Sequence, residues 1–287
     1  MTIGQRLAIG DLLASLALIL AAGASAAGLL WPELYRDNAA MTAQARGTDL
    51  ATLLVAVPAL GVGLWLARAR SRAAQLIVLG MLGYLVYAYA IFAFQVVINP
   101  ATPAYIVILG LAAWSLLLRL PVLGSAAEAG VGARLPRRVT AGFLGLIVFA
   151  FGGLWLSEIV GAIGSGALPA SVSDLDLPTS AVYTLDLAFL LPAMVVAGLL
   201  LIRGSALAAP LAVALLAFSV GMVLSILGLF VFQALDGIAV DPVMAAVFTV
   251  IGLVAFVLAV AGSRPPSTTA GEAAVAARHA TGAGRVA

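Results

Sequence analysis

Six polar side chains in this sequence lie in or beside long apolar segments. Glu158, Asp186 and Asp49 carry carboxylates, and Tyr87, Gln95 and Asn99 follow one another along the segment 74–98 and the residue after it. An ionisable group inside a membrane costs a few kcal/mol, and such groups commonly mark ion pathways or proton relays, or pair with a donor. The chemistry that we expect from these residues is binding of a cation, a proton or an amine.

Each of the three carboxylates also has a plainer interpretation. Glu158 lies about five residues, or roughly 7 Å, from the outer end of its apolar segment. It either serves a binding site or snorkels to water as a boundary carboxylate. Asp49 and Asp186 begin apolar segments, where a carboxylate caps free N–H groups and suits the helix dipole. Alternatively, the two acids face each other across a repeat axis as a ligand site.

The third apolar segment carries a polar and aromatic stripe. At 100° per residue, Tyr84, Tyr87, Gln95 and Asn99 fall within an arc of about 120°. Such a stripe lines a cavity or holds the bundle together through hydrogen bonds between helices.

The residue types exclude several chemistries. The chain has no Cys, no Lys and one His, so thiolate metal sites and cysteine nucleophiles are excluded. It contains no P-loop, Rossmann glycine pattern, HExxH or GxSxG. We therefore predict no catalytic residue, no metal, no cofactor and no enzyme activity. A formal net charge of +2 gives no reason to expect nucleic acid as a partner.

Composition shows which elements must position these side chains. Hydrophobic residues make up 64% of the 287 and charged residues only 9%, against roughly 25% in soluble domains. A membrane-crossing helix needs about 20 mostly apolar residues. Helices are the expected elements because backbone groups cannot stay unpaired in lipid. We predict an all-α bundle of about eight transmembrane helices, at residues 7–31, 50–67, 74–98, 103–123, 140–163, 186–202, 208–233 and 243–262.

Arginine positions predict the orientation. With the N-terminus inside, twelve Arg fall on the cytoplasmic side and two, Arg36 and Arg46, fall outside. Most acids show the reverse bias. Both termini are therefore expected in the cytoplasm. The Ala-rich composition with Arg as the only strong base suggests a bacterial plasma membrane.

The two halves of the chain resemble each other, which predicts an internal duplication. Asp49-Leu50-Ala51 matches Asp186-Leu187-Ala188, and Phe92-Ala93-Phe94-Gln95 matches Phe230-Val231-Phe232-Gln233. Four spans per half imply parallel repeats, an arrangement found in some transporters. We predict a first repeat at 1–138, a second at 139–265 and a disordered cytoplasmic tail at 266–287.

Several smaller features accompany this plan. Pro58 and Pro192 interrupt the second and sixth predicted helices, and proline there frees a backbone carbonyl and bends the helix. Trp155 is assigned to the aromatic belt near the outer interface. The loop 164–185 is either a lid or an ordinary surface loop. Asp11, near the inner end of the first span, is expected to pair with Arg6 or to cap a helix.

Two stretches look like a recurring segment of multi-pass bacterial membrane proteins. They are GMLGYLVYAYAIFAFQVVINP, at 80–100, and the region from Trp155 to Pro192. The resemblance covers about half of the chain. It implies the architecture and no activity, because that family has no assigned function.

These observations favour a transporter-like or small-ligand-binding membrane protein, with its site in the outer half between the repeats. Its expected partners are the lipid bilayer and a small cation or amine, and no oligomeric state is predicted. A second class is a non-transporting sensor, scaffold or assembly partner, whose core would be filled. An intramembrane lipid-modifying enzyme is the third, and it would need two acids in one cavity, with Glu158 and Asp186 the only plausible pair.

Overall fold

The computed structural model describes residues 2–264 and is all-helical over that range, with no strand. Eight of its helical segments are long and apolar enough to cross a membrane. This confirms the prediction of an all-α, multi-pass membrane protein. The predicted tail at 266–287 lies outside the described residues. The eight segments are Ile3–Leu30, Ala39–Arg68, Arg72–Gln95, Thr102–Arg119, Arg137–Ser165, Ala181–Ile202, Ala208–Leu235 and Pro242–Ser263.

Two of these spans are composite, because each contains a five-residue π-helix. The second span consists of α2, η1 and α3, and the sixth of α9, η2 and α10. In chain order the elements are α1 (Ile3–Leu30), α2 (Ala39–Ala51), η1 (Thr52–Ala56), α3 (Val57–Arg68), α4 (Arg72–Gln95), α5 (Thr102–Arg119), α6 (Val122–Glu128), α7 (Arg137–Ser165), α8 (Ala170–Ser173), α9 (Ala181–Leu185), η2 (Asp186–Leu190), α10 (Leu191–Ile202), α11 (Ala208–Leu235) and α12 (Pro242–Ser263).

The π-helical turns explain the two membrane prolines. Pro58 is the second residue of α3 and Pro192 is the second residue of α10. Proline has no N–H to donate to the carbonyl one turn earlier, and its ring crowds that carbonyl. A wider turn relieves the crowding, so each proline follows directly after a π-helix rather than breaking its span.

The second span begins at Ala39, which is 11 residues before the predicted start at 50. Asn38 caps it, and its side chain accepts a hydrogen bond from the Met41 N–H. Residues 39–49 are polar enough to escape a hydropathy scan, yet their alanines favour helix. Asp49 therefore lies inside a helix, so the prediction that it caps one is wrong. Asp186 does not cap a helix either, because α9 precedes it.

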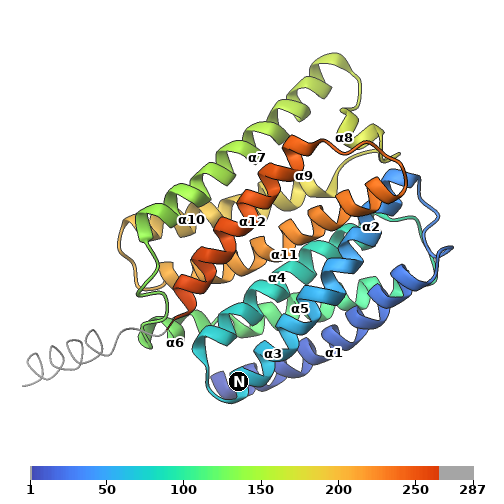
Figure 1. Ribbon diagram of the computed structural model, residues 1–287. Helices are drawn as coiled ribbons and strands as arrows, with labels where there is room; N and C mark the ends of the chain where they lie inside the picture. The colour runs from blue at the N-terminus through green and yellow to red at the C-terminus, as the bar shows by residue number, and fades with distance from the viewer. Residues whose placement is uncertain (1, 265–287) are drawn as a thin grey trace, which may run out of the picture.

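Helix α11 is the central helix of the bundle, packed along α2, α4 and α12 (Figure 1). Small residues allow this close approach. A Cβ added to Gly47 of α2 would lie 2.1 Å from the Leu229 backbone nitrogen of α11. One added to Gly80 of α4 would lie 2.5 Å from the Ala214 carbonyl oxygen. The first and last four spans are thus joined through backbone contacts that only glycine permits.

The remaining helices pack differently in the two sets of four spans. In the first set α1 packs along α5, and α4 packs between α3 and α5. In the second set α7 packs mainly against α10, and α12 mainly against α11. Large apolar side chains such as Phe149 on α7 and Val250 on α12 are exposed on the outer faces, as expected for lipid-facing spans.

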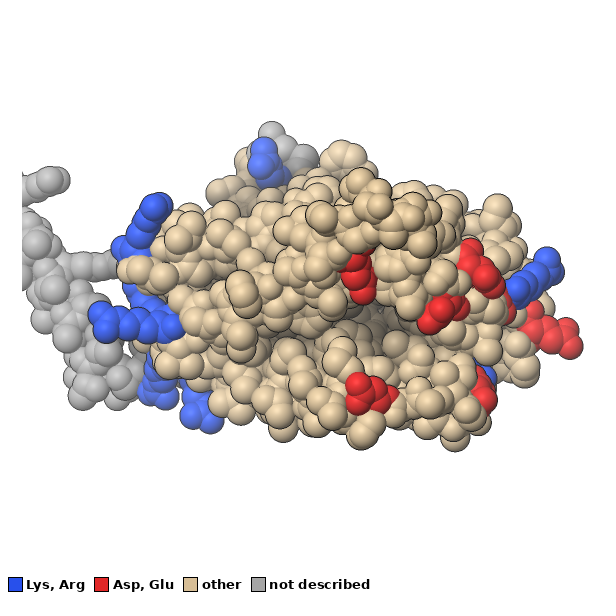
Figure 2. All heavy atoms as spheres, turned by 90° about the horizontal axis from the view of Figure 1, so that it is seen from above, with Lys and Arg blue, Asp and Glu red and all other residues tan. Residues whose placement is uncertain are grey.

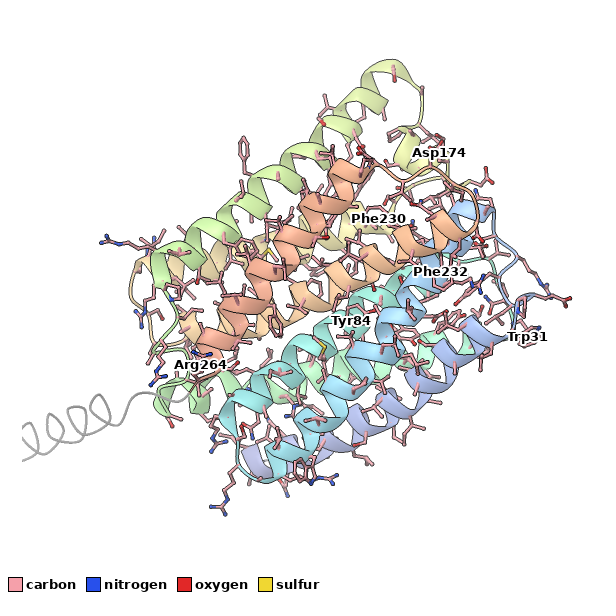
Figure 3. The ribbon with its side chains drawn as sticks, viewed as in Figure 1. Trp31, Tyr84, Asp174, Phe230, Phe232 and Arg264 are labelled. Carbon is pink, nitrogen blue, oxygen red and sulfur yellow. The ribbon has the colours of Figure 1, made fainter. Side chains whose placement is uncertain are left out.

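Charges divide between the two ends of the bundle, and Figure 2 shows most basic side chains at one end and the acidic ones towards the other. We call the first end the arginine-rich end; both ends of the described chain lie there (Figures 1 and 3). Its arginines are Arg6, Arg68, Arg70, Arg72, Arg119, Arg134, Arg137, Arg138, Arg203 and Arg264. The opposite, acid-rich end carries Glu33, Asp37, Asp174, Asp176, Asp236 and Asp241.

Near the arginine-rich end, Asp11 of α1 forms an ion pair with Arg119 of α5. The expectation that it pairs with Arg6 or caps a helix is therefore wrong. Arg119 is almost fully buried, so this pair fastens the first span to the fourth.

Candidate functional site

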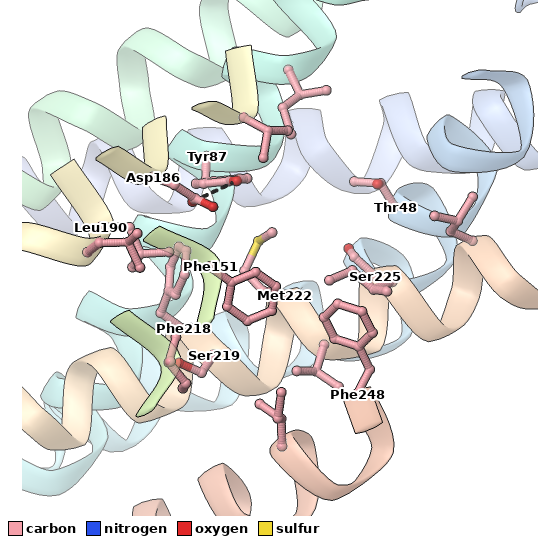
Figure 4. Close-up of a pocket in the computed structure, with 18 of the residues that line it drawn as sticks. Thr48, Tyr87, Phe151, Asp186, Leu190, Phe218, Ser219, Met222, Ser225 and Phe248 are labelled. Carbon is pink, nitrogen blue, oxygen red and sulfur yellow. Dashed lines mark hydrogen bonds between the residues drawn. The ribbon is translucent and has the colours of Figure 1, made fainter. Parts of the chain in front are cut away.

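A cavity of about 360 Å³ lies within the acid-rich half of the bundle and reaches towards its middle (Figure 4). This volume is at the lower end of the range for small-molecule sites, about 300–1,000 Å³. Most of its walls come from α7, η2, α10, α11 and α12, with α2 and α4 closing the remaining side. The polar lining side chains are Gln44, Thr48, Tyr87, Trp155, Asp186, Ser219 and Ser225, and the others are aliphatic, aromatic or methionine.

Asp186 is the one carboxylate that lines the cavity. It lies in η2, and its backbone carbonyl accepts the π-type hydrogen bond from the Leu191 N–H. Its Oδ1 accepts a hydrogen bond from the Tyr87 hydroxyl at 2.9 Å, which Figure 4 marks. Its Oδ2 accepts one from the Trp155 indole N–H at 2.7 Å. Helices from both sets of four spans therefore meet at this carboxylate.

No basic side chain accompanies Asp186. Among residues 2–264 the only ion pair is that of Asp11 with Arg119, far from the cavity. Asp186 is only 6% exposed, and both of its hydrogen-bond donors are neutral. Burying an ionised carboxylate without a countercharge costs several kcal/mol. The site thus favours either a proton on Asp186 or a cationic group beside it.

Aromatic rings from α7, α11 and α12 line the cavity. Phe151 of α7 contacts Phe248 of α12, with ring centroids 5.9 Å apart, and Trp155 at 6.1 Å. Phe230 lies 6.1 Å from Phe248. Such rings attract a cation through their faces, most strongly when water is excluded. A carboxylate and several aromatic rings in one cavity form a suitable environment for an organic cation.

A second group of hydroxyls lies on the α2 side of the cavity. Tyr84 of α4 is fully buried, and its hydroxyl lies 2.7 Å from the Ser225 Oγ and 2.9 Å from the Thr52 Oγ1. It also lies 3.3 Å from the Thr48 carbonyl oxygen. Thr48 and Ser225 line the cavity, whereas Tyr84 holds α2, α4 and α11 together behind them. The packing interpretation of the third-span stripe therefore applies to Tyr84.

Of the six residues predicted from the sequence, the structure brings Asp186 and Tyr87 together in the cavity. Glu158 is not part of the lining. It lies on α7, where its Oε2 accepts hydrogen bonds from the Ser171 hydroxyl at 2.7 Å and from the Tyr183 hydroxyl. Glu158 thus fastens α8 and α9 to α7.

The other three predicted residues lie elsewhere. Asp49 is fully buried among the first four spans, where the Tyr35 hydroxyl donates to its Oδ2. Gln95 is buried at the end of α4, and its Oε1 has no hydrogen-bond partner within the described residues. Asn99 is not on the helix, because α4 ends at Gln95; its Oδ1 accepts the Ala101 N–H in the following turn. The stripe along 84–99 is therefore shorter than predicted.

Sequence reasoning missed Trp155 as a site residue by assigning it to the aromatic belt. It also missed Thr48, Ser219 and Ser225, whose small hydroxyls carry no distinctive sequence pattern. A usable signal for Trp155 was its position three residues before Glu158, within a turn of an acid already singled out. The partner across the cavity, Asp186, comes from a different span.

No family model, no curated protein and no solved structure matches this chain.

Proposed function

We propose that this protein is a transporter-like membrane protein that binds a small organic cation, such as an amine, in the cavity beside Asp186. The observation that carries this proposal is a buried carboxylate at the edge of an apolar cavity, held by Tyr87 and Trp155 and without a basic partner within residues 2–264. A bound ammonium group would supply the missing charge, and the aromatic lining would hold its apolar part.

The position of Asp186 in η2 supports a moving site rather than a static one. π-Helical turns inside α-helices occur frequently at functional sites, and irregular mid-helix turns often mark hinges. A ligand bound to Asp186 would contact the backbone at this irregular turn. It would also bridge the two sets of four spans, since Tyr87 belongs to α4 and Asp186 to the sixth span.

The rival function classes receive less support. A scaffold predicts a filled bundle core, whereas this core contains a cavity of about 360 Å³. A lipid-modifying enzyme predicts two converging acids, whereas Glu158 is bonded to Ser171 and Tyr183 outside the cavity lining.

We further propose that the two sets of four spans are parallel repeats, with the arginine-rich end and both termini in the cytoplasm of a bacterium. Matching π-helices support the duplication: η1 begins at Thr52 and η2 at Asp186, and the prolines Pro58 and Pro192 each follow six residues later. This register pairs Asp186 with Thr52 instead of Asp49. The orientation is supported by the arginine bias.

A thermal-shift titration of purified protein with benzyltrimethylammonium tests the proposed function. A ligand that binds only the folded state stabilises it by about 2.7 kcal/mol at a hundredfold excess over Kd. We expect such a shift for wild type and for two control variants, Glu158→Gln and Asp236→Asn, which remove acids outside the cavity. We expect its loss in Asp186→Asn.

Lowering the pH should weaken the shift, because a protonated Asp186 carries no charge. An equal shift in Asp186→Asn and wild type would place any cation site elsewhere and refute the proposal. The absence of a shift with benzyltrimethylammonium in wild type would also refute it.

A further inference from the structure

The cavity reaches the side of the bundle between α7 and α12. Figure 2 views the molecule from above relative to Figure 1, the side on which α7 lies, and shows a hollow in this face with acidic side chains around it. Met244 of α12 lines the cavity and is 40% exposed. Met244 is the third residue of α12 and follows Asp241 of the acid-rich end, so the opening lies near that end of the face, where lipid headgroups meet hydrocarbon when the spans lie in a bilayer.

The opening follows from the packing of the second set of spans. In the first set α1 packs along α5. In the second set α7 packs mainly against α10, and α12 packs mainly against α11. Phe151 and Phe248 touch across the interval, with ring centroids 5.9 Å apart. Both side chains line the cavity, so this pair stands between part of the cavity and the lipid.

We propose that the ligand is an amphiphilic alkylammonium ion that reaches the cavity from the bilayer, between α7 and α12. Its cationic head is held at Asp186, and its alkyl chain lies along the apolar lining towards the opening. This inference rests on the proposed function, because it assumes cation binding at Asp186. It adds the ligand class and the route.

Three observations favour this occupant. Asp186 and the aromatic rings suit an ammonium head. Much of the remaining lining, including Leu190, Met222 and Ile226, is apolar and suits an alkyl chain. The opening lies where headgroups meet hydrocarbon, and an amphiphilic cation concentrates at this level, whereas a small hydrophilic cation does not.

A quenching experiment tests the ligand class. Trp31, Trp65 and Trp114 are each at least 47% exposed, so replacing them with Phe leaves Trp155 as the reporter beside Asp186. This variant in lipid nanodiscs is titrated with dodecylammonium that carries a nitroxide quencher on its chain. We expect saturable quenching that disappears with Asp186→Asn and persists with Asp236→Asn. Quenching that is linear in ligand and equal in all variants would come from lipid-dissolved ligand and would overturn the inference.

Cross-linking tests the route. Because the chain has no native Cys, the linker can react only with the two introduced cysteines. Phe151→Cys and Phe248→Cys are introduced together, and the same protein is compared before and after a short dithiol-reactive linker joins α7 to α12. We expect stopped-flow quenching to become at least tenfold slower after linking. An unchanged rate in a protein that still shows saturable quenching would refute access between these helices.

The results separate this inference from the proposed function. A response to benzyltrimethylammonium that depends on Asp186, without saturable quenching by the amphiphile, would leave the proposed function standing and refute the inference. Failure of both ligands would refute both.

Discussion

Replacing Gly47 with Ala should separate α2 from α11, because the two backbones touch at this point. The new Cβ would lie 2.1 Å from the Leu229 nitrogen and 2.5 Å from the Gly228 carbonyl carbon. Carbon atoms settle at about 3.5–4.0 Å. The helices must therefore move apart by about 1.5 Å, since backbone atoms cannot rotate away as a side chain can.

Two effects set the magnitude of this change. Ala in place of Gly favours the helix by about 0.8–1.0 kcal/mol. Overpacking a well-packed contact costs about 1–3 kcal/mol and occasionally more. A clash with backbone atoms should cost an energy at the upper end of this range. The separation of the helices also weakens contacts along the rest of the α2–α11 interface. We expect a net loss of about 2 kcal/mol or more in the free energy of unfolding.

Gly110→Ala is the matched control. Gly110 lies inside α5, and a Cβ added there meets nothing within 4 Å, so only the gain in helix propensity remains. Unfolding of both variants is followed in mixed micelles by titration with a denaturing detergent. Because Thr48 and Ser225 lie near this crossing, Gly47→Ala should also weaken cation binding. Stability of Gly47→Ala equal to that of Gly110→Ala would refute the backbone contact.

Three further predictions concern other groups that are buried or partly buried. Trp155→Phe removes the indole donor to Asp186 and should lower stability by about 1–3 kcal/mol and reduce the cation-induced thermal shift; unchanged values would contradict the site geometry. Gly28→Ala would bring a Cβ to 1.8 Å from the Asp49 Oδ2, so it should destabilise the protein, and less so in an Asp49→Ala background, as a double-mutant cycle measures. Burial raises the pKa of the Asp37 carboxyl, so ionisation of this group lowers the stability of the folded protein as the pH rises. Asp37→Asn should therefore have a higher apparent Tm than wild type at neutral pH. This difference in Tm should vanish as the pH falls towards 3.8, the ordinary pKa of the carboxyl.

Hydropathy predicted the eight spans because lipid demands long apolar helices. It could not detect the polar first part of the second span, at residues 39–49. Gln44, Arg46 and Thr48 lower the hydropathy of residues 39–49, although Ala39, Ala40 and other alanines there favour helix. The result was a predicted outer loop where the structure has a helix that closes one side of the cavity.

The cavity could be predicted only in part. Asp186 and Tyr87 were identified because polar groups are rare in such segments. The bond between Asp186 and Trp155 depends on how α7 and the sixth span are rotated relative to each other. That rotation is set by packing and by η2, whose only trace in the sequence is a proline six residues after its start. The sequence ranked Glu158 no lower than Asp186, and only the path of α8 and α9 shows that Glu158 is hydrogen-bonded to Ser171 and Tyr183 outside the cavity lining.

The π-helix at Asp186–Leu190 holds one residue more than an α-helical turn would in the same place. Such a surplus can pass along a helix as hydrogen bonds exchange partners, and each residue that it passes turns through about 100° and shifts by about 1.5 Å. Movement of the surplus towards α9 would carry Asp186 away from Tyr87 and Trp155 without unfolding the span. The sixth span therefore has a built-in way to change which side chain faces the cavity while remaining a continuous helix.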